Sequence, residues 1–479
     1  MNRDLEPRAC RMLFWALLVV FQICGGPLWG FSVGARDVSG GALPFFRELK
    51  STLPGQTGTP TFGYSYRPDG GMTAITENLS GTVRSYTYAY GDQGLLVDRA
   101  SAKARTSPWR TVSIPSRDGR GRISAASTTL AGQSNPVFNE AWTFAGWKDS
   151  KITGYVRATT GAEPENWSYG YDAETPADLV SGRSRLTRET PPASLAPTQR
   201  FAFDFGKSGG LGVRTSAATG LNQTPAFHHA VAEDGGLNSF ARTEKESVHG
   251  ISWTNGFDAR GNVVSRAGSD GSTQQLAWDA LGRLISVTTP GVSESQAYYD
   301  GFNRRIRTEF TPSNGATQTL DSAFDPQIEF LELAVTASQE GQRVWKVYGP
   351  DVTGVYGGAQ GVGGLEALVD EATGTSLGVV NDLFGNVAGT VGGDLSFKSS
   401  LRVGAYGPLP GQTAVDTGNL LQSLAAATVW QGRRMDPTSV MARHLLFRPG
   451  HGKRLENGLG PEERRGGATT RSHRGFLSD

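Results

Sequence analysis

The chain has 479 residues, a formal net charge of +1 and 64 glycines. This length allows two or more ordinary domains or one elongated repeat array. The near-neutral charge argues against a strongly basic nucleic-acid binder. The glycine share, roughly twice the usual ~7%, is typical of many short strands joined by tight turns. We therefore expect an all-β protein without a nucleic-acid partner.

The N-terminal segment has the order of parts found in a secretory signal peptide. Arg3, Arg8 and Arg11 precede the apolar run 12–21, and small residues follow up to Ala35. The apolar run is too short for a membrane span. We expect residues 1–35 to be removed near Ala35, which leaves no stable membrane span and a secreted or cell-surface protein. An uncleaved anchor is the alternative.

Both cysteines, Cys10 and Cys24, lie within this segment. The mature chain would therefore have no thiol, which excludes disulfides, thiol catalysis and cysteine metal sites. Its stability has to come from strand pairing and burial.

Residues 36–240 contain an irregular series of aromatic residues at alternate positions, as in 62–66, 86–90 and 169–172. Alternation places the rings on one face of a strand. A sugar-binding platform is one interpretation, and cross-strand packing within a sheet is the other. Cross-strand packing is favoured over a sugar-binding platform because the rings recur at the same position of a degenerate repeat.

Residues 241–398 carry a regular repeat: an aromatic residue followed by aspartate occurs three times between 252 and 308, with the aspartates 21 residues apart. Three residues after each aspartate comes glycine or asparagine, and a related unit follows later in the chain. The turn residues that we single out are Asp258 with Gly261, Asp279 with Gly282, Asp300 with Asn303, and Asp382 with Gly385.

Turn geometry explains this spacing. The aspartate side chain accepts hydrogen bonds from nearby main-chain amides, and the closing position needs a positive φ, which glycine and asparagine tolerate. Each unit is therefore predicted to be a β-hairpin. An acid–base pair needs two carboxylates converging on one bond, whereas a periodic array spreads its aspartates, so we interpret them as turn caps.

The tracts FDARGNVVS, WDALGRLISVT and YDGFNRRIRT resemble the YD repeats of bacterial RHS proteins, insecticidal toxin-complex components and animal teneurins. The resemblance implies tandem hairpins that form an extended sheet, curled or spiralled into a partial shell. It also implies an exported, non-enzymatic scaffold on a bacterial surface, or a remnant of a polymorphic-toxin carrier. The candidate partners are a polypeptide cargo and a cell-surface glycan.

Two other functions remain open from the sequence. A carbohydrate-binding adhesin would use the aromatic residues on an exposed face. A hydrolase inside the shell would need converging carboxylates. The sequence has no phosphate-binding loop, dinucleotide fingerprint or Gly-x-Ser-x-Gly elbow, and the neighbours His228 and His229 would point to opposite faces of a strand. We predict no catalytic residue, cofactor or metal site.

The C-terminal part changes character. We expect a flexible, glycine-rich excursion at 354–364 and a short helix at 420–429. Residues 399–438 resemble the beginning of the RHS-associated core, which implies an aspartyl autoprotease. Arg448 stands where that motif has an aspartate, so we predict no self-cleavage. Residues 439–479 form a basic tail that we expect to be disordered; a decayed or frameshifted end and a basic interaction tail are both compatible with it.

Overall fold

A computed structural model describes most of the chain between Gly30 and Arg434. The described residues are 30–33, 48–52, 61–91, 96–103, 109–119, 121–146, 149–171, 186–195, 199–202, 213–216, 226–230, 242–248, 251–325, 328–338, 341–400, 402–404, 407–408, 419–428 and 434. The predicted basic tail, Arg448 and nearly all of the predicted signal segment lie outside them.

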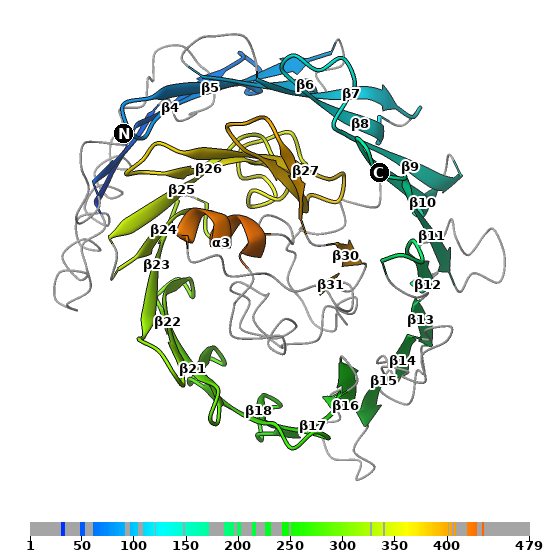
Figure 1. Ribbon diagram of the computed structural model, residues 1–479, viewed down its shortest axis with the longest axis vertical. Coiled ribbons are helices and arrows are strands. Elements are labelled where there is room, and N and C mark those ends of the chain that lie inside the picture. The colour runs from blue at the N-terminus through cyan, green and yellow to red at the C-terminus, as the bar shows by residue number, and fades with distance from the viewer. Residues whose placement is uncertain are drawn as a thin grey trace, which may run out of the picture.

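In this part of the chain, 29 strands pair in sequence order, each antiparallel to the next, as one continuous meander. The meander winds around an interior (Figure 1). It begins with β1 (Gly30–Val33) and β2 (Glu48–Thr52). β1 pairs with β2, although its residues fall within the predicted signal segment. The described ends of the meander do not pair with each other, so the sheet is open.

The strands fall into three regions. The outer layer consists of β3 (Thr61–Tyr66), β4 (Met72–Asn78), β5 (Val83–Tyr90), β6 (Leu96–Lys103), β7 (Arg110–Arg117), β8 (Ile123–Leu130), β9 (Phe138–Gly146), β10 (Asp149–Thr159) and β11 (Glu165–Tyr171). The wall consists of β12 (Leu186–Thr190), β13 (Gln199–Ala202), β14 (Val213–Ser216), β15 (Ala226–Ala230), β16 (Arg242–Val248), β17 (Ile251–Phe257), β18 (Val263–Gly268), β19 (Thr273–Trp278), β20 (Leu284–Thr289), β21 (Ser293–Tyr299) and β22 (Arg305–Pro312). The inner layer consists of β23 (Gln318–Phe324), β24 (Glu332–Ala337), β25 (Gln342–Tyr348), β26 (Leu365–Asp370), β27 (Ser376–Asn381), β28 (Val387–Val391) and β29 (Phe397–Ser399).

The inner layer passes beneath the outer layer, and we call the packed face between them the seam (Figure 1). One core cluster joins both layers, with Phe62 and Trp345 at 5.7 Å between ring centroids. A second cluster joins them further along, where Phe138 stacks on Phe397 at 5.8 Å. Two strand layers with facing apolar side chains exclude water from the space between them.

The short helix expected at 420–429 is present as α3 (Leu420–Ala427). Asn419 caps it by accepting a hydrogen bond from the amide of Gln422 at 3.2 Å. α3 lies on the interior side of the inner layer (Figure 1), and its residues Leu421 and Leu424 belong to the core cluster. A two-stranded sheet, β30 (Val403–Gly404) and β31 (Gly407–Pro408), precedes the helix. Within the described residues, no helix has the length and apolar character needed to cross a membrane.

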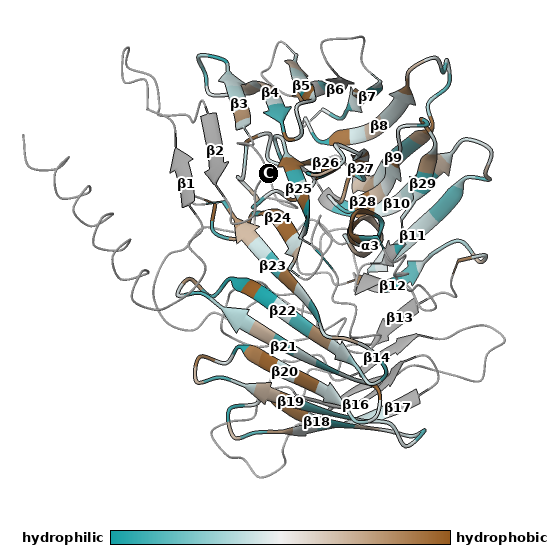
Figure 2. Cartoon of the chain, turned by 60° about the vertical axis from the view of Figure 1, so that its left-hand side comes forward, coloured by the Kyte–Doolittle hydropathy of each residue, from teal (hydrophilic) through white to brown (hydrophobic). Residues whose placement is uncertain are grey.

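Burial follows the layering, and Figure 2 shows hydrophobic and hydrophilic residues alternating along the wall strand β22. Along β19, buried and exposed side chains alternate, because one face of a wall strand contacts the rest of the protein less than the other. All residues of β26 and β28 are buried, because these strands are covered on both faces. The inner layer is therefore the centre of the structure.

The loop at 354–364 corrects the expectation of a flexible excursion. The carboxylate of Asp351 accepts hydrogen bonds from the amides of Ala359 at 2.5 Å and Gly361 at 3.3 Å. A Cβ added at Gly361 would lie 2.4 Å from Leu331, so the main chain packs directly on the core. The glycines thus permit close approach and positive φ, and the loop is a compact part of the fold.

Candidate functional site

The seam is the candidate functional site because it buries charged side chains between two layers of the same sheet. Four arginines of the outer layer reach across it and donate hydrogen bonds to main-chain carbonyls of the inner layer. Such charge-assisted bonds are directional, so they align the two layers more specifically than apolar contact alone. The pairs are Arg84 with Gly374, Arg99 with Gly363 (2.9 Å), Arg110 with Val379, and Arg157 with Ala388 (2.6 Å).

Glu366 of β26 is the centre of the first charged cluster. Its carboxylate lies 2.5 Å from Arg110 and 3.5 Å from Arg99, and it accepts a hydrogen bond from the hydroxyl of Tyr88 at 3.2 Å. Glu366 and Arg110 are both about 1% exposed. Burial raises the pKa of Tyr88 well above its usual value, which keeps it a hydrogen-bond donor. The cluster joins β5, β6 and β7 to β26.

Glu332 of β24 forms a second cluster on the interior side. Its carboxylate lies 2.7 Å from the buried ammonium of Lys346 and 4.0 Å from Arg434. Burial alone would raise the pKa of Glu332, but Lys346 and Arg434 together lower it to about 2. Arg434 belongs to the segment that resembles the RHS-associated core, so that segment reaches the inner layer.

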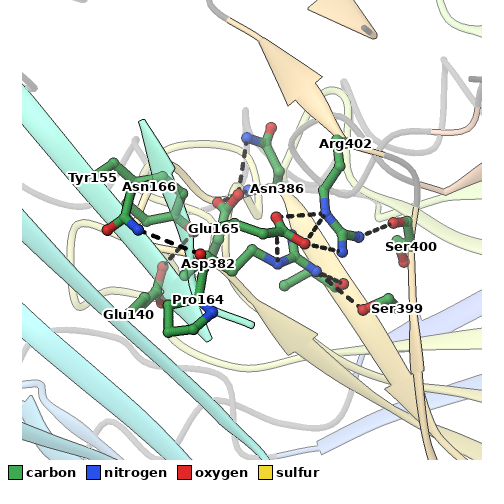
Figure 3. Close-up of polar contacts among 12 residues, drawn as sticks. Glu140, Tyr155, Pro164, Glu165, Asn166, Asp382, Asn386, Ser399, Ser400 and Arg402 are labelled. Atoms are coloured by element: carbon green, nitrogen blue, oxygen red, sulfur yellow. Dashed lines mark hydrogen bonds and ion pairs between the residues drawn. The ribbon is translucent and has the colours of Figure 1, made fainter. Parts of the chain in front are cut away.

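Glu140 of β9 is the central carboxyl of the third cluster, which Figure 3 shows. It accepts hydrogen bonds from the hydroxyl of Tyr155 at 3.1 Å and from the amide of Leu383, across the seam, at 2.9 Å. Leu383 follows Asp382, so two carboxyl groups from distant parts of the chain become neighbours. Burial, and then the charge of Asp382, raise the pKa of Glu140 well above its usual value.

Asp382 closes its own turn between β27 and β28. Its Oδ1 accepts hydrogen bonds from the amides of Phe384 at 2.9 Å and Asn386 at 2.8 Å. Burial raises the pKa of Asp382 to about 6, even though these amides and the charge of Arg157 favour the ionised form. Burial therefore favours a proton on this pair, whose two carboxyl groups titrate together.

Arg402, just after β29, fixes the chain beside this pair. Its Nε donates to Glu165 Oε2 at 2.9 Å and its Nη2 to Glu165 Oε1 at 2.5 Å, a two-pronged contact that holds β11 to the end of the inner layer (Figure 3). Arg157 lies 3.9 Å from the same carboxylate. Burial lowers the pKa of Arg157, and the neighbouring charge of Arg402 lowers it further.

A cavity of about 20 Å³ lies beside Asp382. This is room for about one water molecule, whereas ordinary ligand pockets measure about 300 Å³ or more. Among the described residues, no group of three or more His, Cys, Asp or Glu side chains is placed to hold a metal ion. The lining comes from both layers: Tyr155, Arg157, Trp167, Tyr169, Asp382, Phe384, Asn386, Val387 and Arg402.

The structure places the eight singled-out turn residues in four turns of the same form. Each aspartate accepts two main-chain amides through one carboxylate oxygen, as Asp279 does from Leu281 and Arg283, both at 2.9 Å. The closing residues have positive φ: Gly261 at 87°, Gly282 at 75°, Asn303 at 64° and Gly385 at 80°. Asp258, Asp279 and Asp300 stand apart along the wall, and Asp382 alone meets another carboxyl group in the seam.

Two recurring contacts of the repeat were missed by sequence reasoning. The residue four after the aspartate pairs with its second oxygen, as Arg283 does with Asp279 at 2.6 Å, and Arg283 also donates to the carbonyl of Asp300 in the next turn at 3.1 Å. The aromatic residue before the aspartate donates a hydrogen bond to a carbonyl of the preceding strand, as the hydroxyl of Tyr299 does to the carbonyl of Leu284 at 2.8 Å. A basic residue at positions 283 and 304 was the available signal for the first contact.

The aromatic residue of each unit also coincides with a break in strand register. The shifts lie at Phe257, Trp278 and Tyr299. A bulge there bends the strand and redirects the ring. From that position the indole of Trp278 reaches the carbonyl of Val263 at 2.8 Å, much as Tyr299 reaches Leu284. These rings pack and bond within the sheet.

The described chain is a curled antiparallel sheet (Figure 1) that contains a regular hairpin repeat. The family model of the RHS Repeat matches residues 257–291, which contain the turns of Asp258 and Asp279. The chain thus contains the RHS repeat that its sequence motifs resemble. No curated protein matches the chain.

Solved structures of Tc toxin complexes match the chain at low sequence identity and low TM-score. The chain is 10% identical to a protein in the crystal structure of TcdB2-TccC3-Cdc42, with a TM-score of 0.26 and coverage of 82% of this chain and 29% of that chain. For the crystal structure of TcdB2-TccC3 the identity is 12% and the TM-score 0.25, with coverage of 82% of this chain and 29% of that chain. For the Photorhabdus luminescens Tc holotoxin pore the identity is 11% and the TM-score 0.25, with coverage of 82% of this chain and 28% of that chain. The chain spans less than a third of the length of these proteins.

Proposed function

We propose that this protein is exported and forms an RHS-like β-sheet shell, or a cell-surface scaffold, that encloses or displays a polypeptide and catalyses no reaction. The observation that carries the proposal is the overlap of the sheet with itself. The last strands pack on the first, with Trp345 of the inner layer against Phe62 of the outer layer, so the wall between them bounds an interior (Figure 1).

The carboxyl groups that do converge support a structural role. Glu140 accepts hydrogen bonds from the opposite layer, and Asp382 accepts the amides of its own turn. A glycosidase pair needs room for a sugar between its carboxyl groups. The cavity beside Asp382 has room for about one water molecule. Both side chains are therefore explained by the packing of the layers.

Protease protection tests the enclosing role. The exported protein is recovered from its own bacterium, treated with trypsin while folded, and then denatured and analysed by mass spectrometry. A shell that encloses a polypeptide yields peptides of a second sequence that survive trypsin before denaturation and are cut after it. Absence of any protected second sequence in both secreted and surface fractions contradicts enclosure.

Intact mass of the exported form tests the predicted signal segment. We expect a mature chain that begins shortly after Ala35, and a chain that still begins at Met1 contradicts this expectation. The nucleotide sequence around codon 439, read in the alternative frames, tests descent from a longer toxin carrier.

A glycan array separates the shell from the adhesin alternative. Among the described aromatic side chains, Tyr298 and Phe302 are strongly exposed, at 42% and 51%. Both lie in the wall, Tyr298 on β21 and Phe302 in the turn that follows it. We therefore expect no saturable glycan binding by the purified protein.

A further inference from the structure

We propose that Glu140 and Asp382 form a proton-operated latch of the seam: the turn between β27 and β28 stays docked on the outer layer while the pair holds a proton, and it loosens when both carboxyl groups are ionised. The latch depends only on contacts within the seam, whether or not the shell encloses a polypeptide.

The segment that undocks is the turn between β27 and β28, which contains Asp382 and Leu383. Leu383 donates its amide to Glu140 across the seam, and the neighbouring residue supplies the second carboxyl group. Phe384 of the same turn packs against Trp142 at 4.9 Å and Tyr155 at 5.1 Å between ring centroids. Repulsion between the two carboxylates therefore acts on the residues that dock the turn.

The surrounding charges do not neutralise a doubly ionised pair. The described ionisable groups around it are Tyr155 and Arg157 of β10, Glu165 and Tyr169 of β11, and Arg402 after β29, with Glu189 of β12 beside Tyr169. Arg402 is committed to Glu165. Arg157 donates to the carbonyl of Ala388. With Glu140 and Asp382 both ionised, these two carboxylates and that of Glu165 would face two guanidinium groups in a buried site, and Glu189 adds a fourth carboxylate beside Tyr169.

The direction of the pH response follows from proton binding. Asp382 has a pKa of about 6 in the folded protein and 3.8 as an ordinary side chain. Between these two values the docked turn therefore binds more protons than the undocked turn, so its stability falls as the pH rises from 3.8 through 6. Glu140 shifts in the same direction. The latch is tight in acid and loosens toward alkaline pH.

Amide hydrogen exchange, corrected for intrinsic rates, measures docking in the whole protein. Between pH 5 and pH 8 we expect the protection of amides 383–391 to fall by about tenfold or more, since each unit of pKa shift corresponds to a factor of ten. The wall segment 279–289 serves as the internal control and should change by less than about threefold. Constant protection of 383–391 across this range overturns the latch, whatever the variants do.

The variants assign the response to the pair. Asp382→Asn keeps an oxygen acceptor for the turn amides but cannot ionise, so we expect the step near pH 6 to disappear. The double variant with Glu140→Gln as well should show protection independent of pH up to pH 9. Asp279→Asn, the same change in a wall turn, is the matched control and should retain the step. A step that persists in the double variant contradicts the assignment.

Discussion

The seam and the wall are built from the same hairpin unit, but in the seam the opposite layer of strands covers this unit and in the wall it does not. The turn at Asp279 in the wall and the turn at Asp382 in the seam have the same pattern of amide donors. Partial burial alone would raise the pKa of Asp279, but the amide and guanidinium of Arg283 lower it below its usual value. Burial raises the pKa of Asp382 to about 6. Coverage by a second layer thus reverses the direction of the aspartate's pKa shift, although the main-chain hydrogen bonds of the turn are the same.

The residue two after the aspartate shows the same difference in apolar packing. Leu281 is 62% exposed and Phe302 is 51% exposed at the rim of the wall. Phe384, at the equivalent position in the seam, packs between Trp142 and Tyr155. The repeat therefore presents a side chain at this position, and only the opposite layer determines whether it contributes to the core.

The largest effect should come from a core tryptophan. Trp345→Ala in the inner layer removes a side chain with no exposed surface, and we expect a loss of about 3–5 kcal/mol in the free energy of unfolding. Trp278→Ala in the wall removes a partly buried ring and should cost about half as much. Urea unfolding followed by circular dichroism measures both, and equal losses would contradict the division into two layers.

The second-largest difference in stability between the two regions should come from substitutions of turn glycines. Gly282 and Gly385 both have positive φ, so Gly282→Val should cost about 1–3 kcal/mol. Asparagine tolerates this φ, and nothing lies within 4 Å of a Cβ added at Gly282. A Cβ at Gly385 would lie 2.4 Å from Val362.

Thermal unfolding should therefore show Gly282→Asn close to the parent protein and Gly385→Asn destabilised by about 1–3 kcal/mol. Leu281→Ala, in the exposed part of the wall turn, is the control and should change stability by less than about 0.5 kcal/mol. Equal destabilisation by Val and Asn at position 282 would refute the role of φ in this turn.

Adjacent tyrosines allow a test of the hydrogen bond between repeats. Tyr299→Phe removes the donor to the carbonyl of Leu284 and should cost about 1 kcal/mol. Tyr298→Phe removes an exposed hydroxyl that contacts Gln296 and Glu309 and should cost less than about 0.5 kcal/mol. Chemical denaturation distinguishes them, and a larger loss for Tyr298 would rule out the proposed contribution of the ring before the aspartate.

The pH dependence of global stability should differ in sign between the two aspartates, with a small effect. Asp279 has a lowered pKa, so its contribution is present above its unfolded pKa of 3.8 and is lost as the pH falls. Asp382 has a raised pKa, so its contribution is present below 3.8 and is lost as the pH rises to about 6.

Unfolding midpoints between pH 3 and pH 7 test this difference. Asp279→Asn should flatten the acid side of the stability profile, and Asp382→Asn should flatten the decline between pH 4 and pH 6. Two variants with the same change of slope would show that the seam and the wall do not differ electrostatically.

The chain by itself determined the hairpin unit. Asp279, Gly282 and Arg283 interact within five residues, so the turn, its positive φ and its spacing can be derived from local sequence. The curled, nearly all-β sheet expected from the repeat resemblance is confirmed. The apolar run around Val379 and Val380 was also available as a sign that both faces of β27 are covered. The loop at 354–364 was misjudged because glycine permits close packing as well as flexibility.

Only the tertiary structure decided which side chains meet across the seam. Arg84 lies 290 residues from its acceptor Gly374, and Arg157 lies 231 residues from Ala388. Such pairs depend on how far each hairpin twists relative to the last, summed over many strands, and no local motif records that sum. The convergence of Glu140 with Asp382 arises in this way, because the winding of the sheet brings a turn cap against a carboxyl group of the outer layer.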